Sequence, residues 1–137
     1  MKSEFKNLFK IQSSKKSKQA IIDLGSNSVR MLIYDNFKIS PIPMFNEKAV
    51  CKLGKNLDKS KKLNPDGIKS SLKVLNRFKE ILDISGVLDL EIIATAAFRE
   101  ATDASEFLEE IKRIFDKKPL VLSGEEEART SANGVMV

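Results

Sequence analysis

Two apolar runs, residues 20–24 and 29–34, lie on either side of a polar stretch, residues 25–28. The runs are rich in isoleucine, leucine and valine, and the stretch between them supplies glycine, serine and asparagine, which favour tight turns. We therefore predict two strands joined by a turn, in which Gly25 permits a backbone conformation closed to other residues. Successive backbone N–H groups in such a turn suit phosphate oxygens, although the same residues also suit an ordinary hairpin.

The rest of the chain alternates between helical and strand patterns. Two prolines confine residues 37–50 to an edge strand or a bulged ribbon. The sequence Asn-Pro-Asp-Gly at residues 64–67 is typical of a helix start, and apolar residues follow it at spacings of three and four. The remaining patterns predict strands at residues 88–95 and 119–122, a helix at 103–115 with an Asp103/Glu106 capping box, and a last helix that begins with a Ser-x-x-Glu box at Ser123.

This order of elements indicates an α/β fold. Three consecutive strands predict an antiparallel meander, and the strands that alternate with helices should pair in parallel. We expect a five-stranded mixed sheet in the order 3-2-1-4-5, with helices on both faces. Residues 1–18 are interpreted as a basic flexible leader, and residues 19–137 as the folded domain.

The net charge of +5 comes from the leader. Six lysines and Glu4 lie within residues 1–18, which leaves equal numbers of basic and acidic side chains in residues 19–137. A neutral folded part argues against specific nucleic-acid binding, and the leader is a solvated extension or an arm that steers anions. The loop before residue 64 contains a second group of lysines. This loop either connects two elements through solvent or attracts a long polyanion. Its lysines are Lys52, Lys55, Lys59, Lys61 and Lys62.

Composition excludes several kinds of chemistry. Cys51 is the only cysteine, so an internal disulfide and a multi-thiolate metal site are excluded. The chain has no histidine, which removes phosphohistidine intermediates and histidine-based triads. No P-loop motif, signal peptide or apolar run of about 20 residues occurs. We expect a cytoplasmic protein without membrane contacts, in which carboxylates or water carry out any acid–base chemistry.

Three polar segments follow predicted strands, namely residues 23–28, 95–99 and 123–129. The carboxyl ends of strands are where ligands bind in open α/β sheets. Arg99 could hold a phosphate through two parallel hydrogen bonds, or serve as a surface ion-pair partner. The three acids of residues 125–127 suit a helix start. Glu126 can form the capping box, while a neighbouring acid faces the ligand-binding cleft expected at the carboxyl ends of the strands and serves as a base for water.

Three motifs resemble the signatures of the exopolyphosphatase and guanosine pentaphosphate phosphohydrolase family. They are Ile-Asp-Leu-Gly-Ser-Asn-Ser-Val-Arg at residues 22–30, Ala-Thr-Ala-Ala-Phe-Arg-Glu-Ala at 94–101, and Ser-Gly-Glu-Glu-Glu-Ala-Arg at 123–129. The resemblance extends over about residues 19–135 and includes residues 52–54. It implies the actin-like ATPase superfamily, in which each half of the protein contains a ribonuclease-H-like sheet, and this chain is similar to the N-terminal half.

The resemblance also implies roles for particular residues. Glu127 would be the catalytic carboxylate that orients or activates water. Asp23 would bind Mg²⁺ directly or through water, and most other metal ligands would come from a second half-domain outside residues 1–137. The residues expected to bind substrate phosphate are Gly25, Ser26, Asn27, Ser28, Thr95 and Arg99.

The implied function is release of terminal phosphate from inorganic polyphosphate or guanosine pentaphosphate, with a role in the stringent response. We expect the full-length form to be a homodimer and residues 1–137 alone to have little or no activity. Two alternatives stay open at this stage: a non-catalytic module that binds polyphosphate or a nucleotide, and a kinase of the actin-like superfamily.

Overall fold

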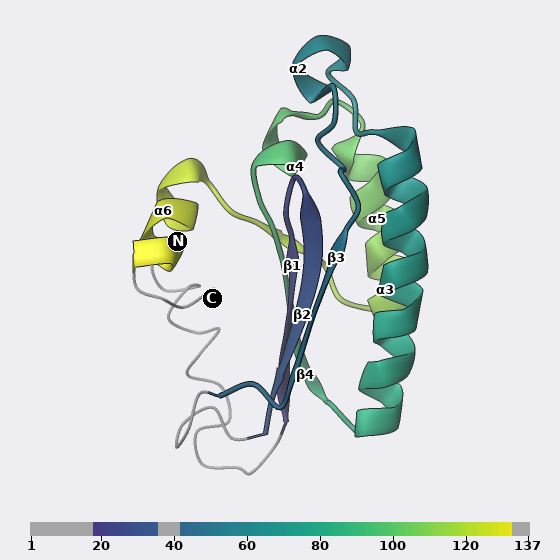
Figure 1. Ribbon diagram of the computed structural model, residues 1–137, viewed down its shortest axis with the longest axis vertical. Helices are drawn as coiled ribbons and strands as arrows, with labels where there is room; N and C mark the ends of the chain where they lie inside the picture. Colours follow the sequence, from purple (N-terminus) through teal and green to yellow (C-terminus); the bar gives the residue numbers. More distant parts are fainter. Residues whose placement is uncertain (1–17, 36–41, 133–137) are drawn as a thin grey trace.

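The computed structural model describes residues 18–35 and 42–132, with side chains up to residue 129. Its strands and helices are labelled in Figure 1. The strands are β1 (Gln19–Leu24), β2 (Ser28–Tyr34), β3 (Phe45–Val50), β4 (Asp89–Ala94) and β5 (Leu120–Val121). The helices are α2 (Leu57–Ser60), α3 (Pro65–Ser85), α4 (Ala96–Glu100), α5 (Ala104–Phe115) and α6 (Gly124–Ala132).

The strands form one mixed sheet in the order β3-β2-β1-β4-β5. β2 pairs antiparallel with both β1 and β3, whereas β4 pairs parallel with β1 and β5. The predicted strand order and directions are therefore confirmed. Because β1 and β4 run in parallel, their carboxyl ends meet at the same end of the sheet, and the segments after them come close together.

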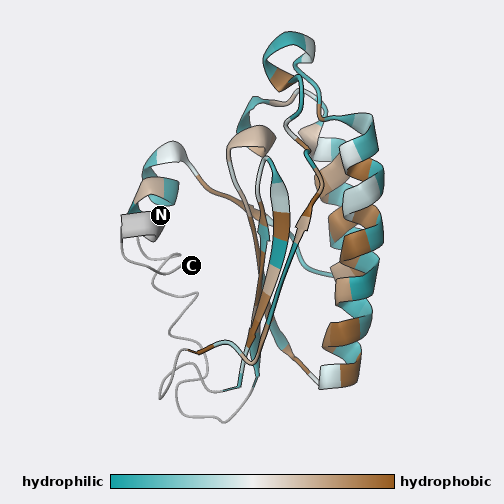
Figure 2. Cartoon of the chain, viewed as in Figure 1, coloured by the Kyte–Doolittle hydropathy of each residue, from teal (hydrophilic) through white to brown (hydrophobic). Residues whose placement is uncertain are grey.

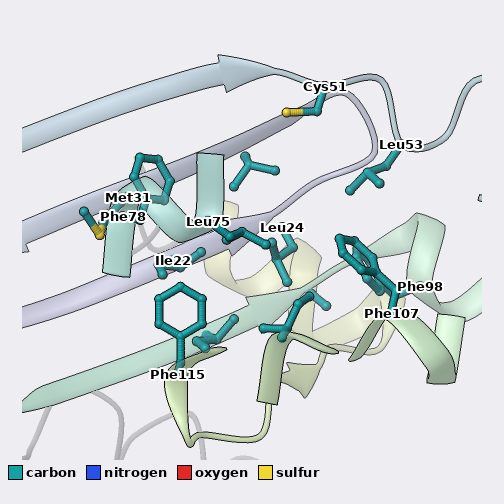
Figure 3. Close-up of a cluster of buried hydrophobic side chains, with 14 of the residues drawn as sticks. Ile22, Leu24, Met31, Cys51, Leu53, Leu75, Phe78, Phe98, Phe107 and Phe115 are labelled. Carbon is teal, nitrogen blue, oxygen red and sulfur yellow. The ribbon is translucent and has the colours of Figure 1, made fainter. Parts of the chain in front are cut away.

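Helices lie on both sides of the sheet (Figure 1). α3 and α5 lie side by side against one face, and α6 lies on the other side (Figure 1). The main core lies under α3 and α5, and Figure 3 shows Ile22, Leu24 and Met31 of the sheet facing Phe78 and Phe115 of these helices. A smaller cluster of buried side chains lies on the opposite face and comprises Ile21, Leu32, Tyr34, Ile93 and Leu122.

Hydropathy follows this arrangement. The strands carry both brown and teal bands in Figure 2, whereas α2 is mostly teal. No helix in residues 18–35 or 42–132 has the length and apolar character that crossing a membrane requires. The predicted leader lies outside the described residues except for Lys18, whose Nζ donates a hydrogen bond to the Ser85 carbonyl at 2.9 Å.

Several local predictions need correction. Asp103 does not cap α5 with its side chain; its Oδ1 instead accepts the backbone N–H of Leu63 at 3.0 Å, a contact across 40 residues that local spacing does not reveal. α3 begins where the Asn-Pro-Asp-Gly pattern predicts, but the Asn64 side chain donates to the Lys52 carbonyl rather than capping the helix. The short helices α2 and α4 were not predicted, and β3 begins only at Phe45. Gly86 ends α3 in the left-handed conformation, which glycine adopts readily.

Candidate phosphate-binding and catalytic site

The turn of residues 25–28 connects β1 to β2 at the end of the sheet where β1 and β4 finish. The backbone N–H of Gly25 donates to the Ser28 carbonyl at 2.9 Å, which closes the turn. Gly25 does not have a positive φ. The prediction that its backbone conformation is closed to other residues is therefore wrong. A Cβ at this position would lie 3.1 Å from the Ser28 oxygen. Close approach of the two backbone segments therefore explains the glycine.

A second segment, residues 51–54, holds this turn from one side. The backbone N–H groups of Cys51 and Lys52 both donate to the Asn27 carbonyl, at 3.0 and 2.9 Å, and that of Gly54 donates to the Ser26 carbonyl at 2.8 Å. Across a planar trans peptide bond the N–H points opposite to the preceding C=O. The N–H of Asn27 therefore points away from residues 51–54, and it has no acceptor among the described residues. This outward donor suits an anionic oxygen.

Two glycines allow this support to pack tightly. A Cβ at Gly54 would lie 3.1 Å from the Ser26 Cβ. A Cβ at Gly67, in the first turn of α3, would lie 2.8 Å from the Cys51 carbonyl oxygen and 3.0 Å from the Leu53 Cα. The start of α3 therefore packs on residues 51–54, which in turn hold the turn of residues 25–28.

Asp23 lies near the end of β1, on the face opposite the main core. Its Oδ1 atom is buried and has no hydrogen-bond partner. The pKa of Asp23 is raised from 3.8 to about 6, mainly by burial and further by the negative charge of Glu127, while Arg30 opposes the rise. Since Glu127 lies about a hundred residues further along the chain, this electrostatic coupling shows that α6 brings its carboxylate toward the end of β1.

Arg99 is placed by the connection after β4. The backbone N–H and hydroxyl of Thr95 both donate to the Leu24 carbonyl, at 3.2 and 3.3 Å, which ties the start of α4 to the end of β1. α4 then presents Arg99, whose Nη1 donates to the Leu122 carbonyl at 2.7 Å and to Glu127 Oε2 at 3.0 Å. The segments after β1, β4 and β5 therefore converge, as predicted.

The three acids at the start of α6 have separate partners. Glu126 is buried and forms the predicted capping box, because its Oε1 accepts the Ser123 N–H while Ser123 Oγ accepts the Glu126 N–H. Glu125 pairs with Arg129 one helical turn away. Only Glu127 pairs with Arg99. The sequence left open which neighbour of Glu126 belongs to the site, and the pairing with Arg99 together with the electrostatic effect on Asp23 favours Glu127.

A cleft of about 320 Å³ lies beside these residues, on the sheet face opposite α3 and α5. Strand register explains two cations in its lining, because Arg30 lies opposite Asp23 on β1 and opposite Lys48 on β3. Sequence reasoning missed Arg30 and Lys48 as site residues. Period-two alternation indicates which face of its strand a residue occupies, but the pairing register is what aligns Arg30 with Asp23 and Lys48 with Arg30. The lining residues are Ile21, Asp23, Gly25, Asn27, Ser28, Arg30, Leu32 and Lys48.

The predicted site residues thus fall into two adjoining groups. Asp23, Gly25, Asn27 and Ser28 line the cleft, and Ser26 is exposed at the tip of the turn. Arg99 and Glu127 form the ion pair beside it. Thr95 is buried and its hydroxyl is already engaged with the Leu24 carbonyl, so the structure gives it a role in joining the two groups.

The sequence pattern of the Ppx/GppA phosphatase family matches residues 32–137. The chain belongs to this family. It is 36% identical over 116 residues to the guanosine-5'-triphosphate,3'-diphosphate pyrophosphatase of Vibrio cholerae serotype O1, an alignment that covers 85% of this chain and 23% of the relative. It is 30% identical over 110 residues to exopolyphosphatase 1 of Mycobacterium bovis, with 80% of this chain and 32% of the relative covered.

Solved structures support the same assignment of fold. The crystal structure of the Aquifex aeolicus member of the Ppx/GppA protein family matches with a TM-score of 0.76 and 30% sequence identity. The match covers 87% of this chain and 39% of that structure. The chain therefore has the fold of one part of a Ppx/GppA protein, and it spans about a quarter to a third of the length of the two curated relatives.

The residues of this Ppx/GppA family member fit part of a Mg²⁺ site. Mg²⁺ prefers carboxylate oxygens and is commonly bound through one or two carboxylates together with substrate phosphates. The buried, unpartnered Oδ1 of Asp23 is an oxygen of this kind, and the Glu127 carboxylate lies close enough to shift the pKa of Asp23. Within residues 18–35 and 42–132 no cluster of three or more candidate metal-ligating side chains occurs. The described residues therefore supply fewer than three such ligands to the Mg²⁺ site.

Proposed function

We propose that this chain supplies the N-terminal, phosphate-binding half of a phosphohydrolase that releases terminal phosphate from inorganic polyphosphate or guanosine pentaphosphate. The observation that carries the proposal is the placement of Glu127, which is held by Arg99 and is electrostatically coupled to the buried Asp23 at the end of β1. The names of the two family relatives, a guanosine-5'-triphosphate,3'-diphosphate pyrophosphatase and an exopolyphosphatase, support the same chemistry and these two substrates.

In this proposal the terminal phosphate lies against the turn of residues 25–28. The outward N–H of Asn27 and the Arg99 guanidinium bind its oxygens, since both are donors suited to anions. Arg30 and Lys48 add positive charge along the cleft. Binding of phosphate by Arg99 competes with its ion pair to Glu127, so substrate would leave that carboxylate free to accept a hydrogen bond from water.

Glu127 would then orient water for in-line attack on the terminal phosphorus and accept its proton, while the bond from this phosphorus to the bridging oxygen breaks and the shortened substrate leaves with that oxygen. Asp23 would hold Mg²⁺ together with the substrate phosphates, and the metal when bound neutralises negative charge on them. A second half-domain would supply the opposite wall of the cleft and further metal ligands. A cytoplasmic location, a homodimeric full-length form and a role in the stringent response belong to the same proposal.

The proposal is tested with residues 1–137 alone and with a chimaera. The chimaera joins this chain to the part of the Aquifex aeolicus family member that follows the matched region. We expect Mg²⁺-dependent phosphate release from the chimaera with polyphosphate or guanosine pentaphosphate, and little or no release from residues 1–137. Binding of phosphate compounds without release by a folded chimaera would instead favour a non-catalytic module, and transfer of phosphate from a nucleotide to an acceptor other than water would favour a kinase.

A further inference from the structure

The loop of residues 52–62, here called the lysine loop, is joined directly to the turn of residues 25–28. Its first residues donate the backbone hydrogen bonds that hold the Ser26 and Asn27 carbonyls. Figure 1 shows α2, the helical part of this loop, beyond the end of the sheet at which α4 also lies. The lysine loop therefore begins at the proposed phosphate-binding turn and extends outward from it.

Buried leucines give the lysine loop a defined shape. Leu53, Leu57 and Leu63 have exposed fractions of 0%, 6% and 1%, and all three belong to the main core. The far end is fixed by Thr102, whose backbone N–H and hydroxyl both donate to the Lys61 carbonyl. The apolar side chains thus point inward and the backbone is held at both ends, which leaves the polar side chains directed outward.

The outward side chains carry unbalanced positive charge. All five lysines of the loop are exposed, and the only acid between residues 51 and 64 is Asp58. No lysine of the loop forms an ion pair with a described residue. Three loop residues that are not glycine, namely Lys52, Asn56 and Lys61, have φ angles of 57–62°. Such conformations are uncommon and occur often at ligand-binding segments.

The chemistry of the lysine loop suits a long polyanion made of identical, repeating anionic groups. Lysine ammonium groups act as point charges, and a row of them contacts successive anionic groups with little demand on geometry. Residues 52–62 contain no aromatic side chain on which a nucleic-acid base could stack. The charge pattern therefore favours a chain of phosphates over a single-stranded nucleic acid.

We propose that the lysine loop is a second binding site for inorganic polyphosphate, contacted by phosphates distant from the terminal one. This inference rests on the proposed function, because the terminal phosphate is assigned to the turn of residues 25–28. A long polyphosphate would contact the turn and the loop together, whereas tripolyphosphate would occupy only the turn. The loop would thus increase affinity for long substrates selectively.

The test uses the full chain of 137 residues and measures binding of end-labelled polyphosphate of about 100 phosphates at several salt concentrations. The loop variant carries Lys55→Gln, Lys59→Gln and Lys62→Gln, which avoid the positive-φ lysines and so preserve the backbone. Two control variants remove the same charge elsewhere. One changes Lys6, Lys10 and Lys15 of the leader to Gln, and the other changes the exposed Lys69, Lys73 and Lys112 of α3 and α5.

We expect the loop variant to bind long polyphosphate about tenfold more weakly at low salt. The slope of log affinity against log salt concentration should also be shallower, by the equivalent of roughly two to three phosphate contacts. Binding of tripolyphosphate should stay within about twofold, and the control variants should lose much less affinity for the long chain. Equal losses in the loop and control variants would overturn the proposal. It would also be overturned if an RNA of equal charge competed as well as polyphosphate and was weakened equally by the loop substitutions.

A further variant separates this inference from the proposed function. Arg99→Gln should weaken binding of both tripolyphosphate and long polyphosphate, because Arg99 contacts the terminal phosphate. If Arg99→Gln weakens both ligands but the loop variant matches the unmodified chain, only the lysine-loop inference fails. If the unmodified chain binds neither ligand, the terminal-phosphate assignment fails as well.

Discussion

The Arg99 guanidinium lies 3.0 Å from the Glu127 carboxylate and joins α4 to α6. The same Nη1 atom also donates to the Leu122 carbonyl at 2.7 Å, so Arg99 is fixed relative to the end of the sheet by a contact that does not involve Glu127. Both side chains are partly exposed. The pair therefore positions Glu127 while leaving it accessible to water and to a phosphate that competes for Arg99.

This relationship predicts that Glu127→Gln in the active chimaera lowers kcat by about 10²-fold or more. Glutamine keeps the size and one oxygen acceptor for Arg99 but cannot accept a proton, so substrate binding should change little. The matched control is Glu125→Gln, because Glu125 pairs with Arg129 rather than Arg99 and should not affect kcat. Near-normal kcat in Glu127→Gln together with loss in Glu126→Gln would place the base one residue upstream.

The capping box of α6 gives a second prediction. Ser123→Ala removes the acceptor for the Glu126 N–H and should destabilise the start of the helix by about 1 kcal/mol. Hydrogen exchange of the α6 backbone amides should therefore be about fivefold faster. Glu125→Ala is the control, since this side chain is 70% exposed and takes no part in the box. Equal exchange rates in Ser123→Ala and the unmodified chain would mean that the box does not stabilise α6.

Local patterns predicted the sheet because each strand and long helix carries its own signal. Alternation and turn residues placed β1, β2 and β4, and the rules for parallel connections then determined the strand order. The convergence of the segments that carry Asp23, Arg99 and Glu127 followed from that order, because all three segments lie at the carboxyl ends of strands. The choice of Glu127 among the three acids rested on the family resemblance instead.

Contacts between distant segments were not predictable in the same way. Asp103 has the spacing of a cap, yet its carboxylate binds the Leu63 N–H. Arg30 and Lys48 enter the cleft because of the pairing register, which depends on how β2 and β3 meet rather than on either strand separately. The reason for Gly25 also lies in a close approach to Ser28 that no local propensity describes.

A third prediction concerns the support of the phosphate-binding turn. Gly67→Ala places a Cβ 2.8 Å from the Cys51 carbonyl oxygen, a backbone atom that must then shift. We expect the free energy of unfolding to fall by roughly 1–3 kcal/mol, as for other overpacked sites. Because Cys51 and Lys52 hold the Asn27 carbonyl, tripolyphosphate should also bind more weakly to the folded variant.

Urea denaturation and binding measurements check the effect of Gly67→Ala. Ser70→Ala is the control, because Ser70 is an exposed residue of the same helix and should change the free energy of unfolding by less than about 0.5 kcal/mol. A Gly67→Ala variant as stable as this control would show that residues 51–54 can move away from α3 without cost.

The last prediction follows from the raised pKa of Asp23. Its pKa is about 6 in the folded chain, against an ordinary value of 3.8, because of burial and the nearby charge of Glu127. Between these values the unfolded chain releases the proton while the folded chain retains it, so the free energy of unfolding falls as pH rises from 3.8 to about 6. Above that range the folded state carries a buried, unfavourable charge. Asp23→Asn has no such charge and should be more stable than the unmodified chain at pH values above 6.

We expect this advantage of Asp23→Asn to reach about 2 kcal/mol above the folded pKa and to shrink steadily below it. Urea denaturation without Mg²⁺ across this pH range measures it, and Asp66→Asn, at an exposed acid of α3, is the control that should show no comparable trend. Added Mg²⁺ should reduce the advantage, because a cation held by Asp23 stabilises the ionised carboxylate. An advantage independent of both pH and Mg²⁺ would mean that the substitution acts through packing, and that Asp23 does not carry the charge at this end of the sheet.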